Sequence, residues 1–188
     1  LGLHPQLVFE RSHELALFEK YIDTAKFVGE IGLDFGKRFY HSRECQQDVF
    51  NQIIGWCTQS PMKTISIHSV RSDRAVLDVL EKTDCTKRNN CILHWYSGTL
   101  KQLDRAIELG CFFSINEYML NSSTGRPIIE EIPIDRLLLE SDAPFISNIK
   151  TVEQLKRSIG FCLHGLIAIK GKEVPKIIYE TSRQLIGI

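Results

Sequence analysis

The stretch from Phe27 to Asp34 reads FVGEIGLD and joins a short apolar run to two carboxylates, Glu30 and Asp34. The run stops at Glu30 and lacks the strict alternation that a half-buried strand would show. It is typical of a strand that is buried on both faces. Three later runs also stop at ionisable side chains, namely Ile65–Ile67 at His68, Ile92–Leu93 at His94 and Leu137–Leu139 at Glu140 and Asp142.

These runs alternate with helical patterns along the chain. We expect strands over five ranges: Lys26–Ile31, Thr64–His68, Cys91–Trp95, Cys111–Ile115 and Leu137–Ser141. We expect helices over Ser42–Gln59, over Thr99–Leu109, from Thr151 onward and over Glu173–Leu185. Strands that alternate with helices at this spacing predict an α/β fold with a parallel sheet and crossover helices.

The helix expected from Thr151 has a clear start. Thr151 and Gln154 have the spacing of a capping box, in which each residue satisfies a backbone amide near the other. The face that we expect to point inward carries apolar residues at helical spacing, namely Val152, Leu155, Ile159, Leu163 and Leu166.

The charge balance, the length of the apolar runs and the placement of the cysteines indicate what kind of protein this is. The 188 residues include 23 Lys plus Arg and 23 Asp plus Glu, so the balanced charge does not suggest a nucleic-acid coat. No apolar run approaches the roughly 18 residues of a membrane helix. Most of the six cysteines lie in or beside apolar runs and are expected to be buried free thiols, which fits a reducing cytoplasm. Cys85 and Cys91 bracket a polar loop and could instead form a metal or disulfide pair.

The ionisable residues after the apolar runs predict a common site. The carboxyl ends of parallel strands in a barrel meet at one mouth, which would bring Glu30, His68, His94 and Asp142 together. This nitrogen and oxygen donor set suits Zn²⁺, Mn²⁺ or a similar ion and leaves room for a water of lowered pKa. Each residue alone could be a hydrogen-bonded core histidine, a helix cap or a partner of Arg. Their recurrence at four strand ends favours a metal site.

Five motifs, in order, resemble the TatD family of metal-dependent nucleases, which belongs to the amidohydrolase-like (β/α)₈ barrels. They are Gly2–Pro5 (GLHP), Gly29–Asp34 (GEIGLD), Ile67–Ser69 (IHS), His94–Gly98 (HWYSG) and Leu137–Pro144 (LLLESDAP). The combination is more specific than any single piece. Taken together, the motifs extend over most of the chain.

The resemblance implies a role for each matching residue. Glu30 would bridge two divalent ions, of Mg, Mn or Zn, and His68 and His94 would complete the first ion site. Asp142 would bind the second ion and help to activate water, so that Asp142 and Glu30 would be catalytic. The remaining residues would act around the ions: His4, Ser97 and Gly98 near the substrate phosphate, and Asp34 and Glu140 as supports behind the ligands.

The chain also departs from the family pattern. Gln6 stands where the family usually has a histidine, Val70 where it usually has an arginine, and Thr181–Arg183 where it often has an asparagine. The H-x-H pair of the family's first strand is absent. We therefore expect residues 1–188 to be a single (β/α)₈ TIM-barrel domain that lacks about the first two strands. A chain that really began at Leu1 should be weak or inactive.

The leading functional prediction is hydrolysis of DNA phosphodiester bonds by metal-activated water. One alternative is hydrolysis of another ester or amide, which the same metal chemistry would serve. Another is a non-catalytic or assembly-dependent component of a defence complex with partner proteins. The form of Glu117–Leu120 (EYML) and the HWYSG motif resemble the TatD-like component of Qat antiphage-defence systems.

Overall fold

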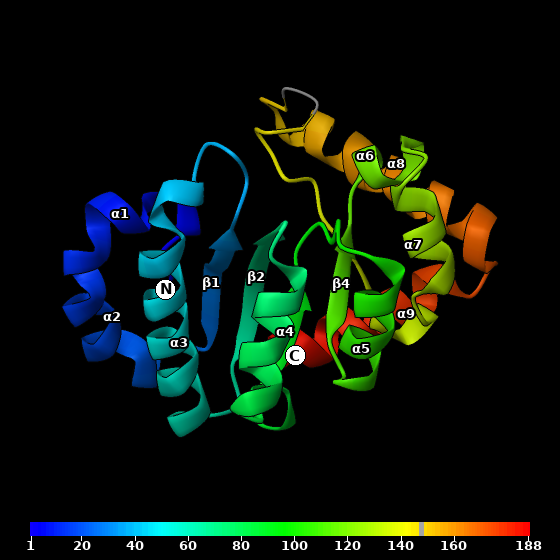
Figure 1. Cartoon of the computed structure of the whole chain (residues 1–188). Coiled ribbons are helices and arrows are strands. Elements are labelled where there is room, and N and C mark those ends of the chain that lie inside the picture. The colour runs from blue at the N-terminus through cyan, green and yellow to red at the C-terminus, as the bar shows by residue number, and fades with distance from the viewer. Residues whose placement is uncertain (147–148) are drawn as a thin grey trace. The chain divides into compact units, whose positions relative to one another are not determined.

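The computed structural model describes residues 1–146 and 149–188 (Figure 1). The chain divides into two compact units, Leu1–Cys111 and Phe112–Ile188. Each unit contains parallel strands with helices packed beside them, as the alternation of patterns predicts. That residues 1–188 form one domain stays a prediction.

The first unit is built on three strands, β1 (Phe27–Asp34), β2 (Thr64–Val70) and β3 (Asn90–Leu93). They pair in sequence order, and both pairings are parallel. The apolar residues of the strands form the core, with Ile31, Ile65 and Ile67 fully buried. The expected runs are therefore confirmed as buried strands.

The strand β1 contains an irregularity that the sequence analysis did not predict. Its register against β2 shifts between Val28 and Ile31, so that β1 carries one residue more than β2 at this point. A bulge of this kind bends a strand and re-aims a side chain. Glu30 therefore lies within β1, at the bulge, and β1 continues to Asp34, three residues beyond the expected strand Lys26–Ile31.

Gly32, just after the bulge, lets β1 approach β2 closely. Its φ of +134° is open mainly to glycine, and a Cβ at this position would lie 2.1 Å from the backbone oxygen of His68. A larger residue would push β1 away from β2 beside His68.

Helices flank this sheet. The expected helix over Ser42–Gln59 is α3 (Arg43–Gln59), which packs on β1 and carries an apolar stripe of buried residues, namely Val49, Phe50, Ile53, Ile54 and Cys57. The other helices of the first unit are α1 (Val8–Arg11), α2 (Leu15–Tyr21), α4 (Asp73–Lys82) and α5 (Leu100–Glu108). Short 3₁₀ turns cover Pro5–Leu7, Ser12–Glu14, Ile22–Thr24, Tyr40–Ser42 and Cys85–Lys87.

The second unit contains the strands β4 (Phe112–Ile115) and β5 (Leu137–Leu139), which pair in parallel. Its helices are α6 (Glu117–Asn121), α7 (Gly125–Glu131), α8 (Val152–Lys170) and α9 (Val174–Ile186), with a 3₁₀ turn at Ile134–Arg136. The predicted capping box of Thr151 and Gln154 at the start of α8 is confirmed.

The predicted inward face of α8 is partly wrong. Val152 is 69% exposed and Leu155 is 38% exposed, whereas Ser158, Cys162 and Leu166 are buried. Residues 151–157 are all exposed, and Ser158 is the first buried residue of α8.

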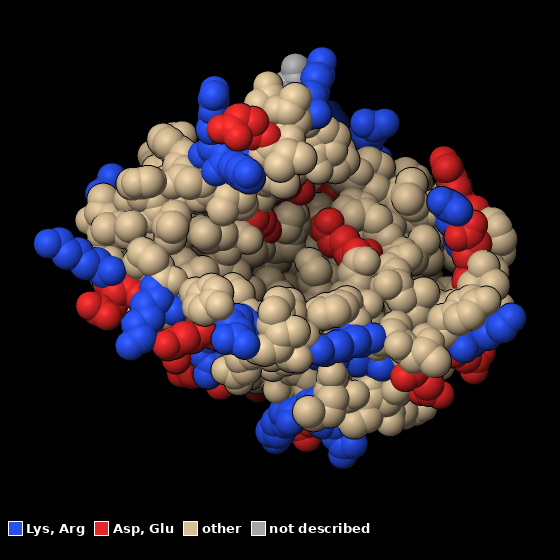
Figure 2. Space-filling view, turned by 180° about the vertical axis from the view of Figure 1, so that it is seen from behind, with Lys and Arg blue, Asp and Glu red and all other residues tan. Residues whose placement is uncertain are grey.

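Charged groups and thiols agree with the sequence analysis. On the face shown in Figure 2, Lys and Arg are interspersed with Asp and Glu. Cys85 and Cys91 are free thiols with sulfur atoms 3.9 Å apart, which is a hydrogen-bond contact and not a disulfide. Within residues 1–146 and 149–188, no helix combines the length and apolar character needed to cross a membrane.

Candidate metal centre

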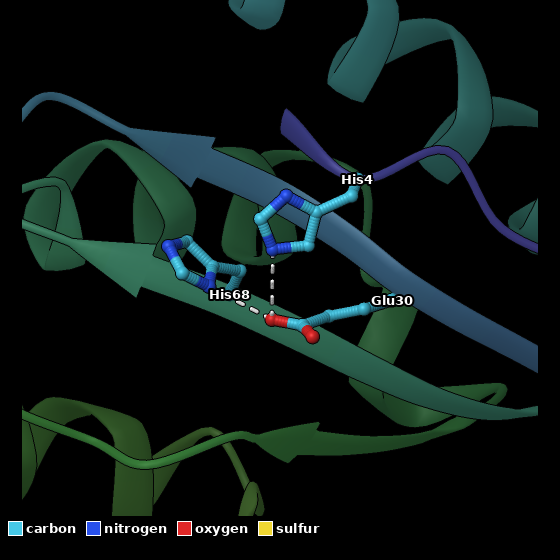
Figure 3. Close-up of side chains that lie close together, drawn as sticks. All are labelled: His4, Glu30 and His68. Carbon is cyan, nitrogen blue, oxygen red and sulfur yellow. Dashed lines mark hydrogen bonds and ion pairs between the residues drawn. The ribbon is translucent and has the colours of Figure 1, made fainter. Parts of the chain in front are cut away.

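Three side chains of the first unit bring possible metal ligands together: His4, Glu30 and His68. One ligand atom from each lies within 4.8 Å of the others. Glu30 Oε1 is 2.8 Å from His68 Nδ1 and 3.5 Å from His4 Nε2. Figure 3 shows both imidazoles pointing at the same carboxylate oxygen, from the N-terminal segment and from β2. The carboxylate of Glu30 is thus the centre of the cluster.

The N-terminal segment reaches Glu30 because it lies along β1. Gly29 N–H donates to Leu1 O at 2.8 Å, and a Cβ on Gly2 would lie 2.2 Å from Gly29 O. Only a glycine fits this close approach of two backbones. It carries His4 to the edge of β1 beside Glu30.

His94 is a third histidine near the same carboxylate. It follows β3, and its backbone N–H donates to Ile67 O at 3.0 Å, which continues the pairing with β2. His94 Nε2 lies 3.9 Å from Glu30 Oε1. The structure therefore brings together Glu30, His68 and His94, three of the four residues predicted to bind metal.

The surroundings of Glu30 keep it charged. Burial of the carboxyl would raise its pKa, but hydrogen bonds with His4 and His68 and the nearby charge of His94 outweigh burial and hold the pKa well below its ordinary value. Glu30 is therefore a carboxylate at neutral pH. A carboxylate that faces three imidazoles is a suitable ligand for a divalent ion.

His68 lies between two carboxylates. Its Nδ1 is 2.8 Å from Glu30 Oε1 and its Nε2 is 3.3 Å from Asp34 Oδ2. An ionised carboxylate only accepts hydrogen bonds, so the contact at Nε2 requires a proton on that nitrogen. The contact between Nδ1 and Glu30 Oε1 then requires either a second ring proton, which makes the imidazole a cation, or a metal ion between the two atoms. This arrangement fits a metal ligand whose other ring nitrogen is held by a carboxylate.

Asp34 is fixed in turn by its neighbours. It is 3% exposed, and its backbone N–H and carbonyl are both bonded by the side chain of Gln46, at 2.7 and 3.1 Å. Gly36 N–H donates to Oδ1 and Gln6 Nε2 donates to Oδ2, both at 2.8 Å. The carboxylate of Asp34 is thus held beside His68, and no motif pointed to Gln46. That Asp34 supports a metal ligand stays a prediction.

His4 is a further histidine at the site, and its contacts indicate which of its ring nitrogens carries the proton. The backbone N–H of Gln6 donates to His4 Nδ1 at 3.3 Å, so this nitrogen is an acceptor. A neutral His4 then carries its proton on Nε2, the atom nearest to Glu30. The geometry favours His4 as a hydrogen-bond donor at the site over a metal ligand. That His4 lies near the substrate stays a prediction.

The turn of Ser97 and Gly98 follows His94 after Trp95 and Tyr96, and hydrogen bonds fix the residues on either side of it. Tyr96 Oη donates to Thr99 O at 3.0 Å, and Thr99 N–H donates to Asp73 Oδ2 at 3.1 Å. A Cβ on Gly98 would lie 2.4 Å from both Tyr96 Oη and Asp73 Oδ2. No motif in the sequence pointed to Asp73.

The remaining predicted residues belong to the second unit. Glu140 accepts hydrogen bonds from Ser114 Oγ and, at 2.9 Å, from Asn116 Nδ2, so its carboxylate is held by β4 and its loop. Asp142 follows β5 with a φ of +46°, and its carbonyl accepts from Phe145 N–H at 2.8 Å. That Asp142 binds a second ion stays a prediction.

Comparison with known proteins gives a family match over nearly the whole chain. A family model described as "TatD related DNase" matches residues 1–187. The human protein named deoxyribonuclease TATDN3 is 25% identical over 93% of this chain and 63% of its own length. The protein named 3′-5′ ssDNA/RNA exonuclease TatD from Erwinia tasmaniensis is 29% identical over 77% of this chain and 57% of its own. The chain thus spans about three-fifths of the length of these curated relatives.

Solved structures agree on the fold. A TatD homologue from Escherichia coli, YJJV, superposes with a TM-score of 0.83 at 24% identity and covers 100% of this chain and 76% of its own. A TatD-family hydrolase from Entamoeba histolytica gives a TM-score of 0.80 at 21% identity, over 98% of this chain and 72% of its own. The fold is therefore the TatD-like TIM-barrel type, as the sequence analysis predicted.

Proposed function

The chain belongs to the family of TatD-related DNases, and on that premise we propose that it is a metal-dependent hydrolase that cleaves phosphodiester bonds in DNA. The relatives named above as a deoxyribonuclease and as an ssDNA/RNA exonuclease support this choice of substrate. The observation that carries the proposal is the ionised carboxylate of Glu30 facing His4, His68 and His94.

The described residues would have two roles at the first ion, as ligands and as a support for a ligand. Glu30, His68 and His94 would hold the first divalent ion, and Asp34 would keep the ring of His68 in place. When bound, the ion would lower the pKa of the attacking water and offset the negative charge of the phosphate. Glu30 would remain ionised throughout, since its surroundings hold its pKa low.

The other predicted residues would act on the substrate. His4, with its proton on Nε2, would donate a hydrogen bond to a phosphate oxygen. The backbone at Ser97 and Gly98 would contact the same group, held in place by Tyr96 and Asp73. In the second unit, Asp142 would bind a second ion and help to deprotonate the attacking water, with Glu140 behind it.

A nuclease assay tests the proposal. The full-length protein, with any sequence that precedes Leu1, is incubated with end-labelled single-stranded DNA and Mg²⁺, Mn²⁺ or Zn²⁺, with and without EDTA. We expect ion-dependent release of nucleotides, reduced at least about 100-fold in Glu30→Gln because the ion loses a charged ligand. Asp142→Asn should also be inactive, while Glu19→Gln, at an exposed glutamate of α2, should retain full activity.

Equal activity in Glu30→Gln and in the unchanged chain would contradict the metal role of Glu30. Normal cutting by Asp142→Asn would contradict the role of Asp142. If the chain instead hydrolyses other esters or amides in a substrate panel and leaves DNA intact, the metal chemistry stands and the substrate is wrong.

The setting of this activity is a further part of the proposal. We propose that the protein acts in the cytoplasm within an antiphage-defence complex. The resemblance of the segment Glu117–Leu120 and of HWYSG to the Qat component supports this, and Tyr118 in that segment is 59% exposed, so it could contact a partner. A plaque assay should show loss of protection when the chain in the complete defence gene set carries Glu30→Gln. Unchanged protection would contradict a catalytic part in defence.

A further inference from the structure

A chain of contacts leads from Gln6 through Asp34 to His68. Gln6 Nε2 donates to Asp34 Oδ2 at 2.8 Å, and the same oxygen lies 3.3 Å from His68 Nε2. We propose that Gln6 is a positioning residue, which aims the carboxylate of Asp34 at His68 Nε2 and so leaves His68 Nδ1 for the metal ion. The inference rests on the proposed metal centre, and it gives a role to a residue at which the chain departs from the family pattern.

The other contacts of Asp34 do not fix the direction in which its carboxylate oxygen Oδ2 points. Gln46 bonds the backbone of Asp34, and Gly36 N–H donates to the opposite oxygen, Oδ1. Among the described residues, Oδ2 contacts two groups, the amide of Gln6 and the ring of His68. Gln6 is the donor that holds this oxygen in place independently of His68.

The orientation of Asp34 Oδ2 matters because Asp34 and Glu30 contact different nitrogens of His68, and each carboxylate favours the ring proton on the nitrogen that it contacts. Glu30 Oε1 is 2.8 Å from Nδ1, a shorter contact than the 3.3 Å between Asp34 and Nε2. A neutral imidazole has one proton, and if that proton sits on Nδ1 the nitrogen cannot bind an ion. A well-placed Asp34 draws the proton to Nε2 and makes Nδ1 the ligand atom. Carboxylates behind metal-bound histidines act in this way.

The side chain of Gln6 can be tested without disturbing His4. The contact of residue 6 with His4 Nδ1 comes from its backbone N–H, which any substitution other than proline retains. Gln6 is exposed, so truncation to alanine leaves no cavity in the core. Gln6→Glu keeps the shape of the side chain but replaces the donor with an acceptor that repels Asp34.

The experiment measures Zn²⁺ affinity of the full chain by competition with a chromophoric chelator. We expect Gln6→Ala to weaken binding about tenfold, at the low end of the 10- to 100-fold range for such outer contacts, and Gln6→Glu at least as much. Asp34→Asn should weaken binding by about 10- to 100-fold. The double variant Gln6→Ala/Asp34→Asn should bind as Asp34→Asn does, because Gln6 acts through Asp34. Gln52→Ala, at an exposed glutamine of α3, should bind as the unchanged chain does.

Several results would overturn the inference. If Gln6→Ala and Gln6→Glu bind Zn²⁺ as the unchanged chain does, Gln6 positions nothing, although the metal centre stands. If the losses of the two single variants add in the double variant, Gln6 does not act through Asp34. If the unchanged chain binds no Zn²⁺, the proposed metal centre itself fails and the inference fails with it.

Nuclear magnetic resonance of the ¹⁵N-labelled histidines gives a second readout, independent of affinity. In the Zn²⁺-loaded chain, His68 should show a bound Nδ1 and a proton on Nε2. A bound Nε2 would overturn the inference. Thermal unfolding of the metal-free variants should match that of the unchanged chain, which separates positioning from a general loss of structure.

Discussion

At the scale of single residues, the candidate site depends on which atom of each side chain faces Glu30. The sequence indicated Glu30, His68 and His94, because each follows an apolar run. It did not place His4 within 3.5 Å of Glu30, since that contact depends on Gly2 packing against the backbone of Gly29, 27 residues away. Contacts between distant segments of backbone leave no periodic pattern in a sequence.

Gly98 gives a prediction at this scale. Gly98→Ala would place a methyl group 2.4 Å from Tyr96 Oη and from Asp73 Oδ2, and the two groups also hold Thr99. We expect a loss of about 1–3 kcal/mol in the free energy of unfolding, as for other overpacked sites. Urea denaturation measures this loss.

Gly55→Ala is the matched control. Gly55 lies within α3, and its added Cβ would meet nothing within 4 Å. The free energy of unfolding of Gly55→Ala should rise by about 0.5–1 kcal/mol, since glycine is a poor helix former. Equal stability of Gly98→Ala and the unchanged chain would mean that the turn after His94 is not packed as described.

At the scale of elements, the five strands and the helices α3, α5, α8 and α9 followed from the sequence pattern, whereas α1, α2, α4, α6 and α7 were not predicted. The bulge at Glu30 in β1 was not predicted, because nothing in the run Phe27–Asp34 marks a bulge except its two glycines. The apolar residues Val152 and Leu155 suggested an inward face for the start of α8. They are exposed because burial depends on what packs against a helix as well as on its own pattern.

Lys63, directly before β2, gives a prediction at this scale. It is 3% exposed, and its Nζ donates to Ile22 O at 2.7 Å and to Ala25 O at 2.9 Å, which ties the end of the N-terminal helical segment to the sheet. Lys63→Met would leave two carbonyls without this donor but would relieve the burial of a charge. We expect a net loss of about 1–3 kcal/mol in the free energy of unfolding.

Thermal or urea unfolding of Lys63→Met tests this, with Lys82→Met, at an exposed lysine of α4, as the control that should change by less than about 0.5 kcal/mol. A Lys63→Met chain as stable as the control would show that the two carbonyls find other partners and that the tie contributes little.

At the scale of the whole molecule, the burial of the cysteine thiols provides a test of how the described residues are packed. Five of the six cysteines are buried and Cys45 is half-buried. Burial raises the pKa of Cys57 to about 12 and that of Cys162 to about 12. The sequence predicted buried free thiols from their apolar neighbours, but it could not rank them by exposure.

We expect iodoacetamide to label Cys45 first in the folded chain between pH 7 and 9, and all six cysteines after unfolding, as read by mass spectrometry. The two buried thiols also ionise less readily in the folded chain than in the unfolded chain. Their contribution to the free energy of unfolding is therefore fully present below the unfolded thiol pKa of about 8.5, and it falls as pH rises toward 12. Cys45→Ser should remove the early labelling. Rapid labelling of Cys57 or Cys162 in the folded chain would contradict the packing around them.

The central claim is that Glu30 and His68 hold a divalent ion through Glu30 Oε1 and His68 Nδ1. Anomalous scattering from crystals of the full chain grown with Mn²⁺ tests it most directly. We predict a peak at coordination distance from both atoms, with His94 beside it, with His68 Nε2 turned to Asp34, and with no peak in Glu30→Gln. An ion bound on the Asp34 side of His68, or no ion at Glu30 in the unchanged chain, would contradict the account.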